Sequence, residues 1–319
     1  MSIVDLRQLS ARQLEPLLEE EARHWREELH WDYRTSLELI KKFVDARSLA
    51  GCAAFENGQA AGYCFYVLED HKGLLGGLYV SSRFPQLTIS RQLLGETLAC
   101  LRAVPRLERI EAQLIPFGIS FDSALAEQGF RLFTRQFMLL RLTDPATGAA
   151  GDHSGKGAPG QRSGLRLERW HDRLFEPCAR LITLSYADHV DGELNDQYRS
   201  EAGALKFLKN IIVLPGCGQF QPEASFVMRT PDSDTLIGVV LTSAVAHGVG
   251  HTTQICVLPG YQGHGLGRQL MDASIQALRA MRYTALSLTV TAVNATAVRL
   301  YERLGFGTLK SFAAGVWQA

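Results

Sequence analysis

A glycine-rich turn between a strand-like run and a helix-like run constrains this chain more than any other feature. The run that ends at Val257 is rich in β-branched and apolar residues, and an amphipathic helical pattern follows from about Gly265. Gly263, Gly265 and Gly267 lie at the junction. Glycine lets a ligand approach the main chain closely, and the first amides of a helix lack partners within the helix. The turn can therefore bind an anion such as a diphosphate.

The glycines alone do not decide the ligand. No Gly-Lys-Ser/Thr follows them, and their spacing does not give Gly-x-Gly-x-x-Gly, so two common nucleotide-binding patterns are disfavoured. An alternative interpretation is that Gly265 and Gly267 serve only the geometry of a strand-to-helix turn.

A second patch lies downstream, at residues 294–306. It has the pattern of a helix that carries Tyr301 and ends at a glycine cap, Gly305. The two patches together resemble the GNAT superfamily of acyl-coenzyme A dependent N-acyltransferases. The pyrophosphate motif of that family, Gln/Arg-x-x-Gly-x-Gly/Ala, is matched by Gln262, Gly265 and Gly267, and the resemblance covers residues 250–312.

The resemblance implies that acetyl-coenzyme A is the co-substrate. The residues expected to bind it are Val257, Gln262, Gly263, His264, Gly265, Leu266, Gly267, Arg268, Asn294 and Tyr301. Arg268 has two interpretations, either a countercharge for the diphosphate or a solvated arginine at the start of the helix.

Acyl transfer to an amine requires that the departing thiolate receive a proton and that the carbonyl oxygen be stabilised. Tyr301 is the expected acid, because a phenol near pKa 10 faces a thiol near 8.5, an uphill transfer of roughly 2 kcal/mol. The alternative is a tyrosine whose ring packs under the sheet. The resemblance assigns the second task to the backbone N–H of Val257, where a strand diverges from its neighbour.

The base is the weakest match to the family pattern. Many GNAT proteins have a glutamate six residues before the valine, and here that place holds His251. An imidazole near pKa 6.5 can accept a proton directly or through water. Alternatively, His251 is a residue at the start of a strand that is satisfied by a neighbouring carbonyl.

The acceptor amine is expected to be a small molecule or an N-terminal amine. A lysine costs about 4.6 kcal/mol to neutralise at pH 7, whereas an α-amino-like group costs only about 1 kcal/mol. In related proteins the acceptor lies between the first two helices and the sheet. This places six residues nearby, of which the first four are the substrate-binding candidates: Asp188, His189, Asp191, Glu193, Asn195 and Asp196. Each has the alternative of an ordinary solvated loop residue. Asp188, His189 and Asp191 could suggest a metal site. We do not expect one, because no further cluster of His or Cys completes a set of four ligands.

The chain divides near its middle. Residues 143–163 contain no large apolar side chain, so we expect a flexible linker between a domain at 1–142 and a domain at 164–319. The halves are related, because Arg91-Gln-Leu-Leu follows Val80 at the spacing at which Arg268-Gln-Leu-Met follows Val257. The counterparts of Gln262, Gly265 and Gly267 in the first half are Pro85, Thr88 and Ser90. We therefore expect the first domain to be degenerate and catalytically silent.

The order of elements in the second half predicts antiparallel strands first and then βαβα, ending in a pair of strands after Thr308. A polar crossing is expected at 187–196. The fold class is α/β, as two tandem GNAT-like domains, each a mixed, mostly antiparallel sheet flanked by helices. Glu19, Glu20, Glu21 and His24 lie on one predicted helix, where an acidic solvated face is expected.

Composition excludes several partners. Lys and Arg number 33 and Asp and Glu 33, so no overall field attracts nucleic acid or an anionic membrane. The six cysteines lie mostly in apolar runs and resemble buried thiols of a reducing cytoplasm. No signal peptide or membrane span is expected. The expected oligomeric state is a monomer or a homodimer.

The sequence thus predicts an N-acetyltransferase that moves an acetyl group from acetyl-coenzyme A to a primary amine by direct attack in a ternary complex. The alternative is a sensor that binds acyl-coenzyme A without turnover, or a structural module. Tyr301 and Asn294 favour the enzyme, and the missing glutamate favours the sensor.

Overall fold

The computed structural model describes residues 1–142 and 164–319, so the expected linker at 143–163 lies outside the described residues. The chain forms two compact units, Met1–Arg135 with Ser311–Ala319, and Gln136–Lys310. This division differs from the expected one at 136–142 and 311–319, each of which lies with the other unit. The chain passes from one unit to the other within two strands, β6 (Arg131–Arg141) and β13 (Gly307–Gln318).

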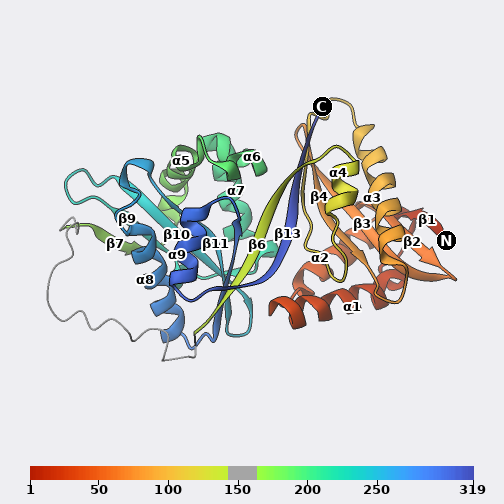
Figure 1. Ribbon diagram of the computed structural model, residues 1–319, viewed down its shortest axis with the longest axis horizontal. Helices are drawn as coiled ribbons and strands as arrows, with labels where there is room; N and C mark the ends of the chain where they lie inside the picture. The colour runs from red at the N-terminus through yellow and green to blue at the C-terminus, as the bar shows by residue number, and fades with distance from the viewer. Residues whose placement is uncertain (143–163) are drawn as a thin grey trace. The chain divides into compact units, whose positions relative to one another are not determined.

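The first unit contains a sheet in the order β1-β2-β3-β4-β5, with the end of β13 paired beside β5 (Figure 1). Only the β4·β5 pairing among these is parallel. Its helices and further strands are β1 (Ser2–Asp5), α1 (Ala11–Leu29), α2 (Arg34–Asp45), β2 (Ala50–Glu56), β3 (Gln59–Glu69), β4 (Lys72–Val80), α3 (Gln86–Arg102), β5 (Arg109–Gln113) and α4 (Asp122–Glu127).

The second unit contains a sheet in the order β6-β12-β11-β10-β9-β7, and the short β8 also pairs with β10. Its strands β7, β9, β10 and β11 are antiparallel, and β11 and β12 are parallel. Its further elements are β7 (Arg166–Arg169), α5 (Phe175–Tyr186), α6 (Val190–Leu194), α7 (Glu201–Val213), β8 (Gln219–Phe220), β9 (Phe226–Arg229), β10 (Leu236–Ala246), β11 (Val249–Val257), α8 (Leu266–Ala280), β12 (Ala285–Thr291) and α9 (Ala295–Arg303).

Helices cover both faces of the second sheet (Figure 1). On one face, Leu270 and Ile275 of α8 pack with Val240 of β10. On the other face, α5 and α7 pack against residues such as Val239 and Cys256. Because β10 is buried on both sides, its sequence is a nearly continuous apolar run instead of an alternating one. The expected α/β sandwich around a mixed sheet is confirmed.

The two units repeat one irregularity at the same place. The β3·β4 register shifts so that Gly76 is an extra residue, and the β10·β11 register shifts so that Thr253 is extra. Gly76 and Thr253 stand at the same distance in sequence before Arg91 and Arg268. Such a bulge bends a strand and increases its twist. The shared bulge supports the common origin that the repeated sequence pattern indicates.

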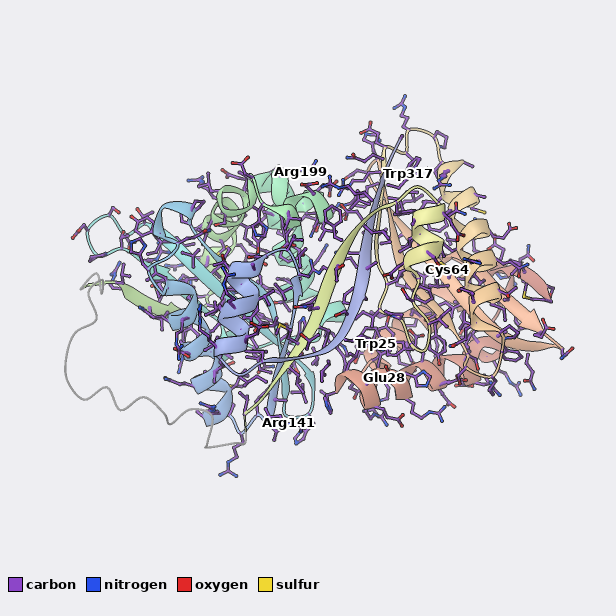
Figure 2. The ribbon with its side chains drawn as sticks, viewed as in Figure 1. Trp25, Glu28, Cys64, Arg141, Arg199 and Trp317 are labelled. Carbon is purple, nitrogen blue, oxygen red and sulfur yellow. The ribbon has the colours of Figure 1, made fainter. Side chains whose placement is uncertain are left out.

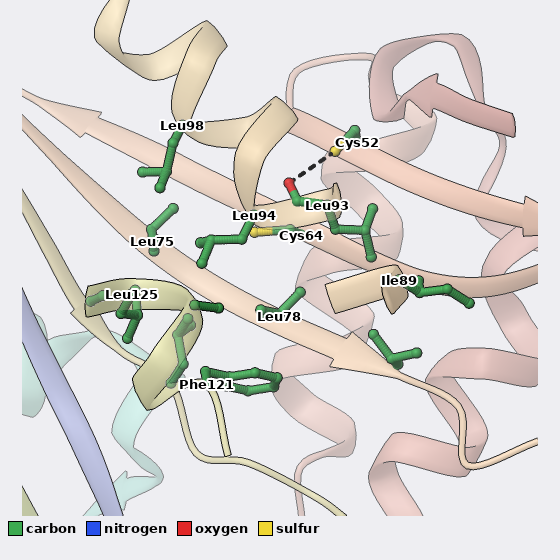
Figure 3. Close-up of a cluster of buried hydrophobic side chains, with 14 of the residues drawn as sticks. Cys52, Cys64, Leu75, Leu78, Ile89, Leu93, Leu94, Leu98, Phe121 and Leu125 are labelled. Carbon is green, nitrogen blue, oxygen red and sulfur yellow. Dashed lines mark hydrogen bonds between the residues drawn. The ribbon is translucent and has the colours of Figure 1, made fainter. Parts of the chain in front are cut away.

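The core of the first unit explains most of its cysteines. Cys52 and Cys64 are buried among leucines of α3, and the Cys52 thiol lies 3.6 Å from the carbonyl oxygen of Leu93 (Figure 3). All six cysteines are free, as expected, and four are buried. Cys100 is exposed, so the expectation of a buried thiol is wrong there.

Three expectations about local structure are wrong. The chain ends in one long strand, β13, instead of a pair. The polar crossing at 187–196 contains the short helix α6. Glu20 and Glu21 are 7% and 5% exposed, so α1 does not present them on a solvated face. Within the described residues, no helix is long and apolar enough to cross a membrane.

Candidate active site

The parallel strands β11 and β12 separate before either one ends. Their pairing begins at Val249 opposite Ala285 and ends at Thr252 opposite Leu288, although β11 continues to Val257. The bulge at Thr253 follows directly after the last pair. A strand bent by a bulge leaves its neighbour, so the second unit contains the divergence of strands that the sequence could not show.

The register directs the amide of Val257 toward this divergence. Leu258 donates its N–H to the carbonyl of Ile237 on β10 (2.9 Å), so that antiparallel pair is a hydrogen-bonded one. The next pair, Val257 opposite Gly238, is therefore a non-hydrogen-bonded pair, and the N–H of Val257 points away from β10. The same alternation turns the N–H of Ile255 in this direction. Ile255 is a second possible oxyanion donor that the sequence analysis missed, because its motif identified only the valine.

The glycine turn has the backbone that its composition predicts. Gly263 and Gly265 have φ values of 78° and 77°, and Gly265 is the N-cap of α8. An added Cβ at either position meets no heavy atom within 4 Å, so the main chain is uncovered there. The first intrahelical bond is donated by Gln269 to Gly265, which leaves the amides of the first turn aimed out of the helix end. A diphosphate is suited to this position.

The motif glutamine ties the turn to the strand. Gln262 donates its side-chain amide to the carbonyl oxygen of Val257 (2.9 Å), so it fixes the peptide next to the divergence. The ring nitrogen Nδ1 of His264 lies 2.8 Å from the carbonyl oxygen of Gln262. Arg268 pairs with Asp272 one turn along the helix (3.4 Å), and its side chain is 54% exposed. The Arg268 guanidinium is therefore exposed and paired within its own helix.

Asn294 and Tyr301 belong to α9, which follows β12. Asn294 caps the helix by accepting the N–H of Ala297 (3.2 Å). Gly305 has a φ of 93° just after the helix, as the glycine cap predicts. Tyr301 is 6% exposed, and its ring packs against Phe306. The ring of Tyr301 is therefore packed, as the alternative interpretation expected. The proposed acidic role concerns a different part of the side chain, the hydroxyl.

Tyr186, at the end of α5, is a residue that the sequence analysis missed. Its hydroxyl donates to the carbonyl oxygen of Ile255 (3.2 Å), in the part of β11 that has left β12. Burial raises the pKa of this phenol well above its usual value. The other contributions come, in order, from Tyr198, Cys256, Asp191 and Tyr301. No motif marks Tyr186, and only the fold brings it to β11.

His251 lies in the paired part of β11 and is buried. Its Nδ1 is 2.9 Å from the hydroxyl oxygen of Ser287 on β12, and its ring stacks on Phe137. The ring thus contacts a hydroxyl on β12, whereas the alternative interpretation expected a neighbouring carbonyl.

Two of the four substrate-binding candidates, His189 and Asp191, belong to a hydrogen-bond network at the end of β12. The hydroxyl of Thr291 donates to the carboxylate of Asp191. The imidazole of His189 lies between Asn294 and Asp191, with Nε2 3.1 Å from the Asn294 amide nitrogen and Nδ1 3.1 Å from the Asp191 N–H. The structure therefore links the segment before α6 with the cap of α9.

The other two substrate-binding candidates are Asp188 and Glu193, which differ in burial. Asp188 is exposed, and Glu193 is partly buried on α6. The helix α6 itself is held by Arg199, labelled in Figure 2, which donates its Nε to the carbonyl of Gly192 (2.7 Å).

Comparison with known proteins supports the resemblance to GNAT acetyltransferases. Residues 191–306 match the acetyltransferase (GNAT) family. The matched region extends from α6 to the glycine cap after α9. Curated relatives are mycothiol acetyltransferases. That of Propionibacterium freudenreichii subsp. shermanii is 32% identical over 151 residues, 46% of this chain and 45% of the relative. That of Beutenbergia cavernae is 29% identical over 180 residues, 56% of this chain and 57% of the relative. Each match thus covers less than two thirds of the relative.

Solved structures show the tandem fold. A GCN5-related N-acetyltransferase from Sphaerobacter thermophilus superposes with a TM-score of 0.66 at 15% identity, over 99% of this chain and 95% of that chain. A tandem GNAT protein from the clavulanic acid biosynthesis pathway superposes with a TM-score of 0.62 at 15% identity, over 99% and 98%. The sequence resembles a tandem GNAT arrangement similar to that of mycothiol synthase. This resemblance is confirmed.

Proposed function

We propose that this GNAT acetyltransferase moves an acetyl group from acetyl-coenzyme A to a primary amine of a small molecule, by direct attack within a ternary complex. The observation that carries the proposal is the direction of the Val257 amide. It points away from β10 where β11 has left β12, directly before the glycine turn. A thioester bound between the strands would meet an amide donor at its carbonyl oxygen.

The turn fits the diphosphate of the coenzyme. The main chain at Gly263 and Gly265 is uncovered, and the amides of Leu266, Gly267 and Arg268 open the helix. Amides and the positive end of the helix dipole favour a doubly charged group here. Gln262 and His264 would act by shaping the turn, and Asn294 by capping α9, so these three would assist binding indirectly.

Three residues would perform the chemistry. The hydroxyl of Tyr301 would give its proton to the departing thiolate of coenzyme A. The N–H of Val257 would stabilise the oxyanion, and His251 would accept the proton that the amine loses. The supporting observations are the place of Tyr301 on α9 and of His251 on β11, the strand that diverges.

The acceptor would contact the segment around α6. Asp191 and Glu193 would balance the charge of an ammonium group, with Asp188 and His189 at the edge of the same segment. The curated relatives carry the name mycothiol acetyltransferase, and we take from that name an acceptor that is a small molecule and not a protein side chain.

The first unit would be catalytically silent. Its helix α3 begins at Gln86, five residues before Arg91, whereas α8 begins only two residues before Arg268. The residues that would form a glycine turn are therefore wound into the helix. Gln86 nevertheless donates its side-chain amide to the carbonyl of Val80 (2.9 Å), as Gln262 does to Val257. The strand end is preserved in the first unit and the diphosphate turn is not.

The test uses the purified full chain, acetyl-coenzyme A and a panel of small amines, with release of free thiol as the signal. Thiol release that depends on an amine supports the enzyme. The imidazole at residue 251, where many GNAT proteins have a carboxylate, favours one other function, a sensor for acyl-coenzyme A. Binding of acetyl-coenzyme A by calorimetry without thiol release for any amine would establish the sensor instead.

A further inference from the structure

Three buried polar residues lie side by side across the second sheet. His251 of β11 is directly opposite Ser243 of β10 in one direction and Ser287 of β12 in the other. Ser243 and Ser287 are both fully buried, and His251 is 9% exposed. Residues directly opposite each other in a sheet project to the same face, so the imidazole has a serine on either side.

Ser287 is hydrogen-bonded to the ring, whereas the hydroxyl oxygen of Ser243 has no hydrogen-bond partner among the described residues. The hydroxyl oxygen of Ser287 lies 2.9 Å from His251 Nδ1 and also 3.2 Å from the carbonyl oxygen of Gly250. A hydroxyl has one proton, and a carbonyl oxygen only accepts. The Ser287 hydroxyl therefore donates to Gly250, and both contacts are satisfied only when His251 donates from Nδ1 to Ser287.

We propose that Ser287 is a positioning residue for His251, holding the neutral imidazole as the Nδ1–H tautomer so that Nε2 is the basic atom. The proposal rests on the proposed function, in which His251 accepts the proton of the acceptor amine. In that step the lone pair of Nε2 takes a proton from the nitrogen that attacks the thioester, and the ring becomes an imidazolium. The Nδ1–H bond to Ser287 is present before and after the transfer, so the base needs no rearrangement.

The sheet explains why this tautomer is stable. His251 and Ser287 lie in the paired part of β11 and β12, next to the last pair before the strands separate. Their backbones are fixed by neighbouring strands, and Phe137 stacks on the ring. The base is therefore held by the rigid part of the sheet while the reaction takes place at the divergent part.

The experiment measures the tautomer directly. Nitrogen-15 NMR distinguishes protonated from unprotonated ring nitrogens, and loss of one set of signals in His251→Gln assigns this ring among the nine histidines. We expect the Nδ1–H form in the wild-type chain above the pKa of the ring. We expect Ser287→Ala to convert it mainly to the Nε2–H form, and Ser287→Thr, which keeps the hydroxyl, to retain Nδ1–H.

Ser243→Ala is the matched control. Ser243 is as buried as Ser287 and equally close in register, but its hydroxyl oxygen has no hydrogen-bond partner among the described residues. The same change from serine to alanine should leave the tautomer as it is. In turnover assays, Ser287→Ala should lower kcat/KM about tenfold with a changed pH profile, whereas Ser243→Ala should change neither.

The outcomes separate this proposal from the proposed function. An Nε2–H signal for His251 in the wild-type chain, or an unchanged tautomer in Ser287→Ala, overturns the positioning role of Ser287. The expected tautomers together with full activity of His251→Gln would overturn the basic role of His251, and with it that part of the proposed function.

Discussion

Replacing Glu21 with glutamine should stabilise the first unit strongly at alkaline pH and much less at pH 5. Glu21 is buried on α1, where its carboxyl oxygens accept the hydroxyl of Tyr63 (2.5 Å) and the indole N–H of Trp25 (3.3 Å). Burial raises the pKa of Glu21 to about 7, and the two hydrogen bonds offset only part of this shift. Glutamine has the shape of the protonated acid, with one accepting oxygen and one donating group.

The direction of the effect follows from proton linkage. The unfolded chain titrates this residue near its ordinary value of 4.5, and the folded chain near 7. The folded state thus binds the proton more tightly, so stability is fully present below about pH 4.5 and is lost as the pH rises to about 7. The difference between a pKa of 4.5 in the unfolded chain and about 7 in the folded chain corresponds to about 3 kcal/mol. Glu21→Gln removes this loss.

The assay is urea unfolding followed by tryptophan fluorescence at pH 5 and pH 8.5. The free energy of unfolding of Glu21→Gln should exceed that of the wild-type chain by about 3 kcal/mol at pH 8.5. Glu20→Gln is the matched control with the opposite sign. Burial alone would raise the pKa of Glu20, but hydrogen bonds from Ser81, Ser82 and Tyr79 outweigh it and lower that pKa. The control should therefore be destabilised at pH 8.5. An advantage of Glu21→Gln that is the same at both pH values would refute the reasoning.

Three further predictions concern the second unit. Tyr301→Phe should lower kcat by about 10² to 10⁴ with little change in the KM for acetyl-coenzyme A, measured by thiol release, because it removes only the proposed acid. Gly265→Ala, at a φ of 77°, should weaken binding of acetyl-coenzyme A in calorimetry by about tenfold, since alanine costs about 1–2 kcal/mol in that backbone conformation. Gly260→Ala in the same loop, with open space and no positive φ, should bind normally. Thr291→Val removes the hydroxyl bond to Asp191 and should raise the KM for the amine alone, which steady-state kinetics with the amine varied would detect.

The sequence predicted the second unit well because its signals are local. The turn residues Gly263 and Gly265 have the positive φ that only glycine adopts readily, and Gly305 ends α9 as a cap. The apolar runs of β10 and β11 and the spacing of α8 fix the kind of each element. Each of these features depends on neighbours in sequence.

The features that sequence reasoning missed depend on distant contacts. Glu20 and Glu21 look like an acidic solvated face until Tyr63 and Tyr79, on β3 and β4, are placed opposite them. Tyr186 lies far from Ile255 in sequence, and no helical pattern indicates that its hydroxyl reaches that carbonyl. The place of the strand end at 311–319 was also not predictable, because its partner is β5, about 200 residues earlier in the sequence and in the first unit.

The two units share most of the structure around the strand divergence. Both keep the bulge, at Gly76 and Thr253, and both end their parallel pairing at the residue before it. Both also hold the peptide after the divergence with a glutamine side chain. They differ in the next few residues, which are helical in α3 and form a glycine turn before α8. Because sheet, bulge and glutamine are common to both, they cannot account for the proposed difference in activity between the two units. The glycine turn, whose amides are proposed to bind the diphosphate, is one feature that differs and that the proposal therefore depends on.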